Sequence, residues 1–519
     1  MVKDTAFEGD PIAESRQSLW LETTPTTEYD PLDGTCRVDT AIVGGGITGL
    51  STAIELKESG QDVAVIESDR IAAATTGNTT AKLTSQHGLK YDTLRSKFDE
   101  ETARQYAEIN EKAIDAVQAR VEADDIDCDF QRTPAYTYAE STTDRSRIHD
   151  EVEAARSIGL PAFFVESTPL PFDTDGAIRF DDQAEFHPRK YLLSIAEDID
   201  GNGSYVFEGT RATNVESGGI CRVATEKGTV VADQVVVASH FPFYDGAGYF
   251  ARMHPKRSYL LAVRVEEDLP AGMYYRPDSP SATIRTAPVR TDEGVEELLI
   301  IGGQSHKPSV DGIDTSERYR RCKEYAEERF TVDSVEYRWS THDYSPVDKV
   351  PFIGQLGPGT DNVYVATGFS GWGMTGGVGA AIILRDLIVD GSSPWAEVFD
   401  PMRITPKASA KSFAEENATI AANYATDWGR AMLSENDLPA PGDGTIVRRD
   451  GRPIAIHRDM DGNLHAVSAV CTHLWCLVRW NDAEKTWDCP CHGSRFSCDG
   501  EVLSGPALEG LRQVYPNGE

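Results

Sequence analysis

Two pairs of cysteine and histidine near the end of the chain have the types and spacing of metal ligands. Cys471 and His473 form the first pair, and Cys489 and His492 form the second after 15 intervening residues. Two such loops can hold a tetrahedral zinc ion, or a binuclear iron–sulfur cluster with both sulfurs on one iron and both imidazoles on the other. Five of the nine cysteines lie between positions 471 and 498, a crowding that favours metal over disulfides in an intracellular chain.

The residues around these pairs resemble the cluster-binding loops of the Rieske family. The two segments read CTHLWC and CPCHGSRF, and Gly505-Pro506-Ala507 matches the loop that covers the cluster in that family. The resemblance implies a 2Fe-2S cluster on the four ligands named above, rather than zinc. It also implies a disulfide between Cys476 and Cys491 that joins the two loops.

Two positions depart from the Rieske pattern. Phe496 stands where high-potential members carry a tyrosine whose hydroxyl bonds a cluster thiolate, whereas Ser494 is kept. Trp475 stands where a glycine is usual. Because one hydrogen-bond donor to the cluster is lost, we expect a reduction potential below that of respiratory Rieske proteins.

A second kind of chemistry is indicated by a glycine-rich turn near the start of the chain. Gly44, Gly46 and Gly49 fit G-x-G-x-x-G, the turn that brings a pyrophosphate to a helix N-terminus. Glu67 follows Gly44 by 23 residues, at the end of the next expected strand. An acid there binds a ribose 2′-hydroxyl, so the sequence predicts FAD or NAD rather than NADP.

The rest of the chain favours FAD over NAD. The glycines Gly302 and Gly303 in IIGGQSH are not followed by a helix, which argues against a reductase that also binds NADH. A late turn, ATGFSGWGMTGG, opens a helix whose N-terminus would stabilise the negative charge of a reduced flavin.

The first 400 residues resemble the D-amino-acid oxidase and glycine oxidase superfamily of FAD-dependent enzymes. The matching segments are AIVGGGITGLSTAIEL, ATTGNTTAKLTSQHG, VVVASH and ATGFSGWGMT. The resemblance implies that Thr75 and Thr76 line the flavin or its pyrophosphate. It further implies contacts to the pyrimidine side of the flavin from Gly371, Trp372, Gly373 and Met374. Some relatives attach FAD covalently through a cysteine near the flavin ring. No cysteine lies between positions 344 and 369 here, so we expect dissociable FAD.

The substrate side is less specific. Enzymes of this superfamily hold an amino-acid carboxylate with an arginine, and the candidates here are Arg285 and Arg257, together with Tyr259. His87 is a further candidate. His240, His342 and Asp343 lie in segments that are expected to be near the flavin.

The expected fold class is α/β plus all-β. Residues 37–68 read as strand, glycine turn, helix and strand, the start of a Rossmann-like FAD-binding domain. A helix is expected over 94–123, and the late unit at 361–389 is expected to return to the first sheet. The predicted division gives an FAD-dependent oxidoreductase at 1–400, a linker and helix at 401–432, and a small β Rieske domain at 433–519. Within the first part, the FAD-binding segments are about 36–90, 200–255 and 335–400, and an inserted mixed-sheet substrate domain takes about 91–199 and 256–334.

The composition limits the partners. The formal net charge is −34, from 84 acidic and 50 basic residues spread along the chain, so nucleic acid is a poor partner. Such a surface is typical of proteins that stay hydrated in concentrated salt. No run of about 18 apolar residues could span a bilayer, and the N-terminus lacks the pattern of a signal peptide. We therefore expect a cytoplasmic protein without a membrane span.

Three functions fit these patterns. In the favoured hypothesis, FAD oxidises a small amine or amino acid and passes electrons one at a time through the cluster to an external redox partner. The alternative is an electron-transfer flavo-iron-sulfur protein without an organic substrate of its own. A third hypothesis treats the C-terminal domain as a redox-sensing or docking module that uses Cys476 and Cys491. The sequence leaves the direction of electron flow open.

Overall fold

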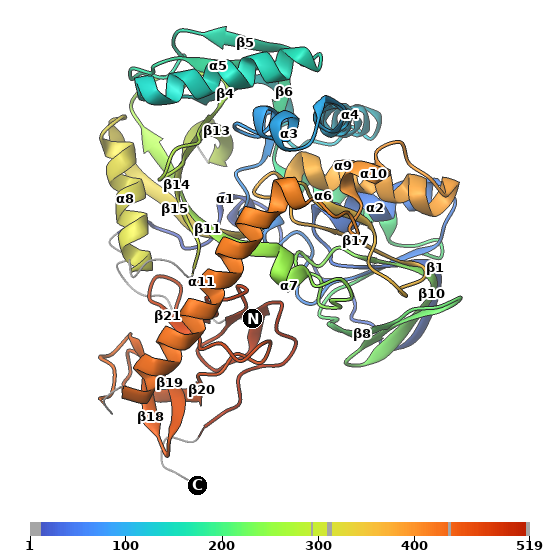
Figure 1. Cartoon of the computed structure of the whole chain (residues 1–519), viewed down its shortest axis with the longest axis vertical. Helices are drawn as coiled ribbons and strands as arrows, with labels where there is room; N and C mark the ends of the chain where they lie inside the picture. Colours follow the sequence, from blue (N-terminus) through green and yellow to red (C-terminus); the bar gives the residue numbers. More distant parts are fainter. Residues whose placement is uncertain (1–11, 292–293, 309–313, 434–436, 515–519) are drawn as a thin grey trace.

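The computed structural model describes residues 12–291, 294–308, 314–433 and 437–514. The outermost residues of the first and last predicted domains, 1–11 and 515–519, lie outside the described residues. Figure 1 shows two large mixed layers in the upper part of the molecule and a small β domain below them, with one long helix running between the two parts.

The first sheet carries the glycine turn. Its order is β16-β17-β10-β1-β2-β7, and β17, β10, β1, β2 and β7 run parallel to one another. The strands are β1 (Gly34–Val43), β2 (Val63–Ile66), β7 (Tyr205–Phe207), β10 (Gly228–Val237), β16 (Phe352–Gln355) and β17 (Val363–Thr367), with β8 (Ala212–Glu216) and β9 (Cys221–Thr225) added beside β10. Helices α2 (Ile47–Glu58) and α9 (Gly373–Arg385) pack on each other over this sheet, and α4 (Glu100–Ala123) and α6 (Pro188–Ile199) pack against them.

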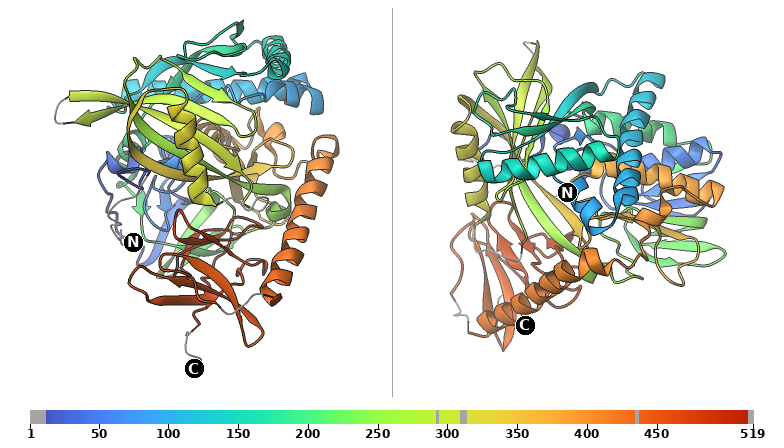
Figure 2. Two further views of the ribbon diagram at one scale, coloured as in Figure 1. Left: turned by 90° about the vertical axis from the view of Figure 1, so that its left-hand side faces the viewer. Right: turned by 45° about the horizontal axis from the view of Figure 1, so that its top comes forward.

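The second sheet forms the inserted layer. Its order is β15-β11-β14-β13-β12-β4-β6-β3, with β5 paired to β6. The strands are β3 (Lys82–Leu83), β4 (Gln131–Tyr138), β5 (Ala162–Val165), β6 (Ala177–Glu185), β11 (Met253–Val265), β12 (Met273–Arg276), β13 (Ala282–Thr291), β14 (Gly294–His306) and β15 (Val332–Pro346). Helices α5 (Thr142–Ser157) and α8 (Thr315–Glu327) cover parts of it (Figure 2), and α3 (Tyr91–Lys97) packs on α5.

The C-terminal part begins with the long helix α11 (Pro406–Leu433), which runs along the small β domain in every view (Figures 1 and 2). Its first sheet contains β18 (Gly444–Arg449), β19 (Arg452–Arg458) and β20 (Leu464–Ser468). The second sheet of this domain contains β21 (Arg479–Asn481), β22 (Thr486–Asp488), β23 (Arg495–Phe496) and β24 (Val502–Ser504).

The remaining elements of the first part of the chain are short. They are α1 (Leu19–Glu22), α7 (Tyr249–Arg252), α10 (Ala396–Phe399) and the single turns η1 (Thr76–Asn78) and η2 (Asp386–Asp390).

The structure confirms the expected fold class, and it differs from the sequence analysis in detail. The helix expected over 94–123 is two helices, because the Asp99 side chain accepts a hydrogen bond from the Thr102 N–H and starts α4 anew. Strand β15 crosses the expected boundary at residue 335, so one strand serves both the flavin region and the inserted layer. Within the described residues, no helix has the length and apolar character to cross a bilayer.

Candidate redox cofactor site

A cavity of about 340 Å³ lies between the two large sheets. The carboxyl ends of β1, β2 and β10 form one wall, and residues of β11, β13 and β15 form the opposite wall. The lining includes Gly44, Gly46, Glu67, Thr75, Thr76, Gly371, Trp372, Gly373 and Met374, nine of the ten residues that the sequence predicted for FAD. The tenth, Gly49, lies one turn into α2, where a Cβ would come within 1.8 Å of the Gly44 carbonyl oxygen.

The glycine turn gives the end of this cavity the form that a pyrophosphate requires. Gly44 has a φ of +115°, and a Cβ there would meet the carbonyl oxygen of Ala238 at 2.5 Å. The Glu67 carboxylate accepts a hydrogen bond of 2.8 Å from the N–H of Gly45, which fixes the acid beside the turn. The N-terminus of α9 opens on the same cavity, and the Trp372 side chain at its N-cap makes no capping hydrogen bond. The residues therefore fit an extended dinucleotide with anionic groups near two helix ends.

The substrate candidates chosen from the sequence lie outside the lining of this cavity. Arg285 is buried against Glu185, and it donates to the backbone oxygens of Thr80 and Ala81. Arg257 and Tyr259 leave β11 on the face opposite the cavity, because successive side chains of a strand alternate. Arg257 instead pairs with Asp488 of the small domain, and Tyr259 bonds His306.

His87 is one layer behind the cavity. Its ring nitrogens bond the Tyr106 hydroxyl at 2.6 Å and the Thr84 carbonyl at 2.7 Å, and its ring stacks on Trp372 with centroids 4.8 Å apart. Burial lowers the pKa of His87 well below its ordinary value, so the imidazole is neutral. This histidine supports a lining residue and does not itself face the cavity.

Two charged groups on the cavity wall form a pair that the sequence analysis did not identify. Lys256 and Asp343 are cross-strand neighbours on β11 and β15, and both line the cavity. Within the described part of the chain, the Lys256 ammonium makes no hydrogen bond or close ion pair. Burial lowers the pKa of Lys256, and the charge of Asp343 opposes this shift. Burial raises the pKa of Asp343 to about 6, against hydrogen bonds from the N–H groups of Tyr344 and Gly371. The alternation of Lys256, Ser258 and Leu260 along β11 groups these residues on one face, although it does not tell which face meets the cavity.

The two Cys/His pairs converge in the small domain. The Cys489 thiol donates a hydrogen bond to the Cys471 sulfur, which lowers the pKa of Cys471 to about 7. The rings of His473 and His492 lie with centroids 5.0 Å apart. The Nδ1 atom of each ring is buried without a hydrogen-bond partner in the described structure. Two adjacent thiols and two unpartnered imidazole nitrogens fit the donor set of a Rieske cluster.

The other two cysteines of the loops are joined in a disulfide. Cys476 and Cys491 have Cα atoms 6.5 Å apart, and their residues are 3% and 2% exposed. Their sulfurs lie close to Cys489, but a bonded pair offers no thiolate to a metal. The pair therefore ties one loop to the other and leaves Cys471 and Cys489 as the free thiols.

The cover over the loops is formed as the family pattern implies. The Ser494 hydroxyl hydrogen-bonds the Cys471 sulfur and accepts a bond of 3.0 Å from the N–H of Ala507. Phe496 is fully buried and brings no hydroxyl. Trp475 has a φ of +58° and is 66% exposed, so its indole lies on the surface rather than over the ligands.

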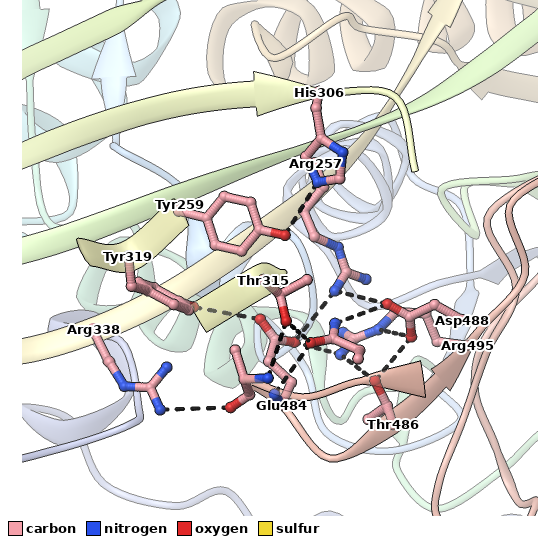
Figure 3. A network of polar contacts seen from close by, with 12 residues as sticks. Arg257, Tyr259, His306, Thr315, Tyr319, Arg338, Glu484, Thr486, Asp488 and Arg495 are labelled. Carbon is pink, nitrogen blue, oxygen red and sulfur yellow. Dashed lines mark hydrogen bonds and ion pairs between the residues drawn. The ribbon is translucent and has the colours of Figure 1, made fainter. Parts of the chain in front are cut away.

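The small domain closes onto the cavity. Leu503, Ser504, Gly505, Ala507 and Leu508 contribute to the cavity lining, although they follow the glycine turn by more than 450 residues. A network of charges holds this contact: Arg257 lies 2.9 Å from Asp488 and 3.6 Å from Glu484, and Arg495 pairs with the same two acids (Figure 3). Burial would raise the pKa of Asp488, but Arg257 and Arg495 outweigh it and hold that pKa at about 2.

Comparisons with known proteins agree with this arrangement. A family model described as FAD dependent oxidoreductase matches residues 39–387, and one described as Rieske [2Fe-2S] domain matches residues 429–515. Over 507 residues the chain is 37% identical to YhfW of Bacillus subtilis (strain 168), whose name describes a Rieske 2Fe-2S iron-sulfur protein; the match covers 96% of this chain and 98% of that one.

Two further relatives match the first part of the chain. The gamma-glutamylputrescine oxidoreductase of Escherichia coli (strain K12) is 24% identical over 375 residues, which cover 67% of this chain and 82% of that one. The crystal structure of glycine oxidase from Geobacillus kaustophilus superposes with a TM-score of 0.58 at 18% identity, and covers 71% of this chain and 99% of that one. The second likeness shows a shared fold.

Proposed function

Because the chain belongs to the family of FAD-dependent oxidoreductases and carries a Rieske [2Fe-2S] domain, we propose that it oxidises a small amine or amino acid and passes the electrons through the cluster to an external one-electron acceptor. FAD takes up two electrons when bound, and a 2Fe-2S cluster carries one. Together they would connect a two-electron oxidation to a one-electron acceptor. The observation that carries the proposal is the shared wall: the loop over the cluster ligands, 503–508, also lines the cavity behind the glycine turn.

The residues divide into three groups by role. The glycine turn, Glu67, Thr75, Thr76 and residues 371–374 are proposed to hold FAD. Cys471, His473, Cys489 and His492 are proposed to hold the cluster, with the Cys476–Cys491 disulfide as a staple of the two loops. The buried position of this disulfide supports a structural role rather than a switch that a partner protein reaches.

The substrate side of the cavity supports an amino acid over a simple amine. Lys256 presents a cation to the cavity, has no hydrogen-bond acceptor among the described residues, and can pair with a carboxylate. Asp343, its neighbour on the adjacent strand, can accept from an ammonium group when ionised. The named activities of two relatives, gamma-glutamylputrescine oxidoreductase and glycine oxidase, are of this chemical kind.

Anaerobic mixing with a panel of amines and amino acids tests the function. We expect one class of compound to bleach the flavin absorbance and then to produce the rhombic EPR signal of a reduced Rieske cluster. A Cys489→Ser protein should still bleach with the same compound but give no EPR signal, because one cluster ligand is lost. Bleaching by no compound would favour an electron-transfer protein without its own substrate. Bleaching without cluster reduction in the unmodified protein would remove the cluster from the electron path.

Lys256 gives a narrower prediction. We expect Lys256→Met to weaken binding of an inert carboxylate such as benzoate roughly 30-fold, because a charge-assisted hydrogen bond contributes about 2 kcal/mol. Binding is measured in the oxidised protein from the shift of the flavin absorbance. Lys256→Arg is the matched control, and it should retain most of the affinity. Equal affinity of the Met variant and the unmodified protein would mean that another group meets the carboxylate.

A further inference from the structure

A thin layer of side chains separates the flavin cavity from the cluster ligands. On the cavity side, His240 follows β10 and Asp343 lies on β15, and both residues line the cavity. Behind them lies Tyr344, whose ring packs on the rings of His240 and His342 with centroids 4.9 and 4.8 Å away. The Thr75 hydroxyl, also on the cavity, donates to the carbonyl oxygen of His342 at 3.2 Å. The layer is therefore continuous with the residues proposed to hold FAD.

The same layer contacts the cluster loops directly. The Tyr344 hydroxyl lies 3.0 Å from the carbonyl oxygen of His492 and 3.2 Å from that of Gly505, so it bridges one ligand residue and the covering loop. Gly493 faces the His342 ring so closely that a Cβ there would come within 2.5 Å of it. Tyr344 is 1% exposed, so its ring is shielded from bulk solvent.

Tyr344 brings a hydroxyl from the other domain to the backbone of the cluster loops. Phe496, within the loops, supplies none. Both ring nitrogens of His342 are buried without a partner in the described structure. An unpartnered polar ring is costly to bury, so its place between the cavity and Gly493 calls for a role beyond packing.

We propose that Tyr344 is the positioning residue that couples the two redox centres: its hydrogen bond to the His492 carbonyl, with the packed His342 and His240 rings, forms the route for electrons between flavin and cluster. The inference rests on the proposed function. Each passage moves one electron from reduced flavin to the oxidised cluster, whose iron goes from ferric to ferrous. A one-electron acceptor outside the chain then reoxidises the cluster, and a second electron follows, so one two-electron oxidation of substrate requires two passages.

The test compares Tyr344→Phe with Tyr249→Phe. Tyr249 is the matched control, since it is fully buried and its hydroxyl donates to the carbonyl oxygen of Leu356 at 2.7 Å rather than to a residue of the cluster loops. We expect Tyr344→Phe to slow reduction of the cluster by the flavin about tenfold, because outer hydrogen-bond partners of metal ligands have effects of this size. The midpoint potential of the cluster, followed by EPR in a dithionite titration, should also fall in Tyr344→Phe and stay unchanged in Tyr249→Phe.

The outcomes separate this inference from the proposed function. If Tyr344→Phe has the potential and the cluster reduction rate of the unmodified protein, the route does not pass through Tyr344. A lower potential with unchanged reduction rate would likewise overturn the route, since Tyr344 would then tune the cluster alone. If the cluster of the unmodified protein is reduced by dithionite but never by the flavin, the proposed function fails first, whatever the variant does.

Discussion

An Arg257→Met protein is expected to lose the firm attachment of its small domain. Arg257 is 3% exposed and faces Asp488 and Glu484 across the interface, and the methionine would leave part of this negative charge buried without a counter-ion. Removing one partner of a buried pair costs about 3 to 5 kcal/mol. We expect the lower end, because Arg495 still pairs with both acids.

Thermal unfolding followed by two signals measures this loss. Visible circular dichroism reports the cluster, and flavin fluorescence reports the first domain. The unmodified protein should lose both signals together, whereas Arg257→Met should lose the cluster signal at a lower temperature. Arg290→Met is the control: Arg290 and its partner Asp127 are both largely exposed, and such pairs contribute about 1 kcal/mol or less. Coincident transitions in Arg257→Met would show that the network does not hold the domains together.

The second large effect is expected from Gly49→Ala, a change of one methyl group. The added Cβ would lie 1.8 Å from the Gly44 carbonyl oxygen and 3.0 Å from its carbon, and both are backbone atoms that no rotamer change can move. Helix α2 must shift away from the turn that meets the pyrophosphate. At about 3 kcal/mol of overpacking, the affinity for FAD falls by roughly a hundredfold.

FAD content after gel filtration and a titration of the apoprotein with FAD measure the effect. Gly219→Ala is the control, because an added Cβ there meets nothing within 4 Å in the exposed loop between β8 and β9. It should bind FAD as the unmodified protein does. Full FAD occupancy in Gly49→Ala would contradict the role assigned to the turn.

The features predicted well from the sequence are those encoded over short distances. The turn at Gly44 and the late unit that ends in α9 have their whole pattern within about thirty residues, and the structure confirms that both units belong to one sheet. The Cys/His pairs could be predicted for the same reason, because each pair lies within one short loop. Local patterns suffice where the residues that act together are close in the chain.

Residues whose role depends on distant segments were not found in this way. Arg257 has the type of a carboxylate-binding residue, but its ion-pair partner Asp488 lies in the small domain, far along the chain. In the sequence, Tyr344 has the pattern of any aromatic residue on a strand. Its role depends on the contacts of its hydroxyl with His492 and Gly505 of the small domain. A period of two in β11 separates Lys256 from Arg257, yet the sequence does not tell which face meets the cavity.

Residues 503–508 of the small domain complete the cavity wall. Binding of FAD in the cavity and docking of the small domain are therefore coupled. A ligand that binds the assembled cavity more tightly than the open one must favour the docked state by the same free energy with which docking favours the ligand. FAD occupancy should therefore protect the interface from proteolysis and hydrogen exchange, and loss of the cluster should loosen the hold on FAD. Through this reciprocity, FAD binding to the first domain and cluster binding to the second domain stabilise each other.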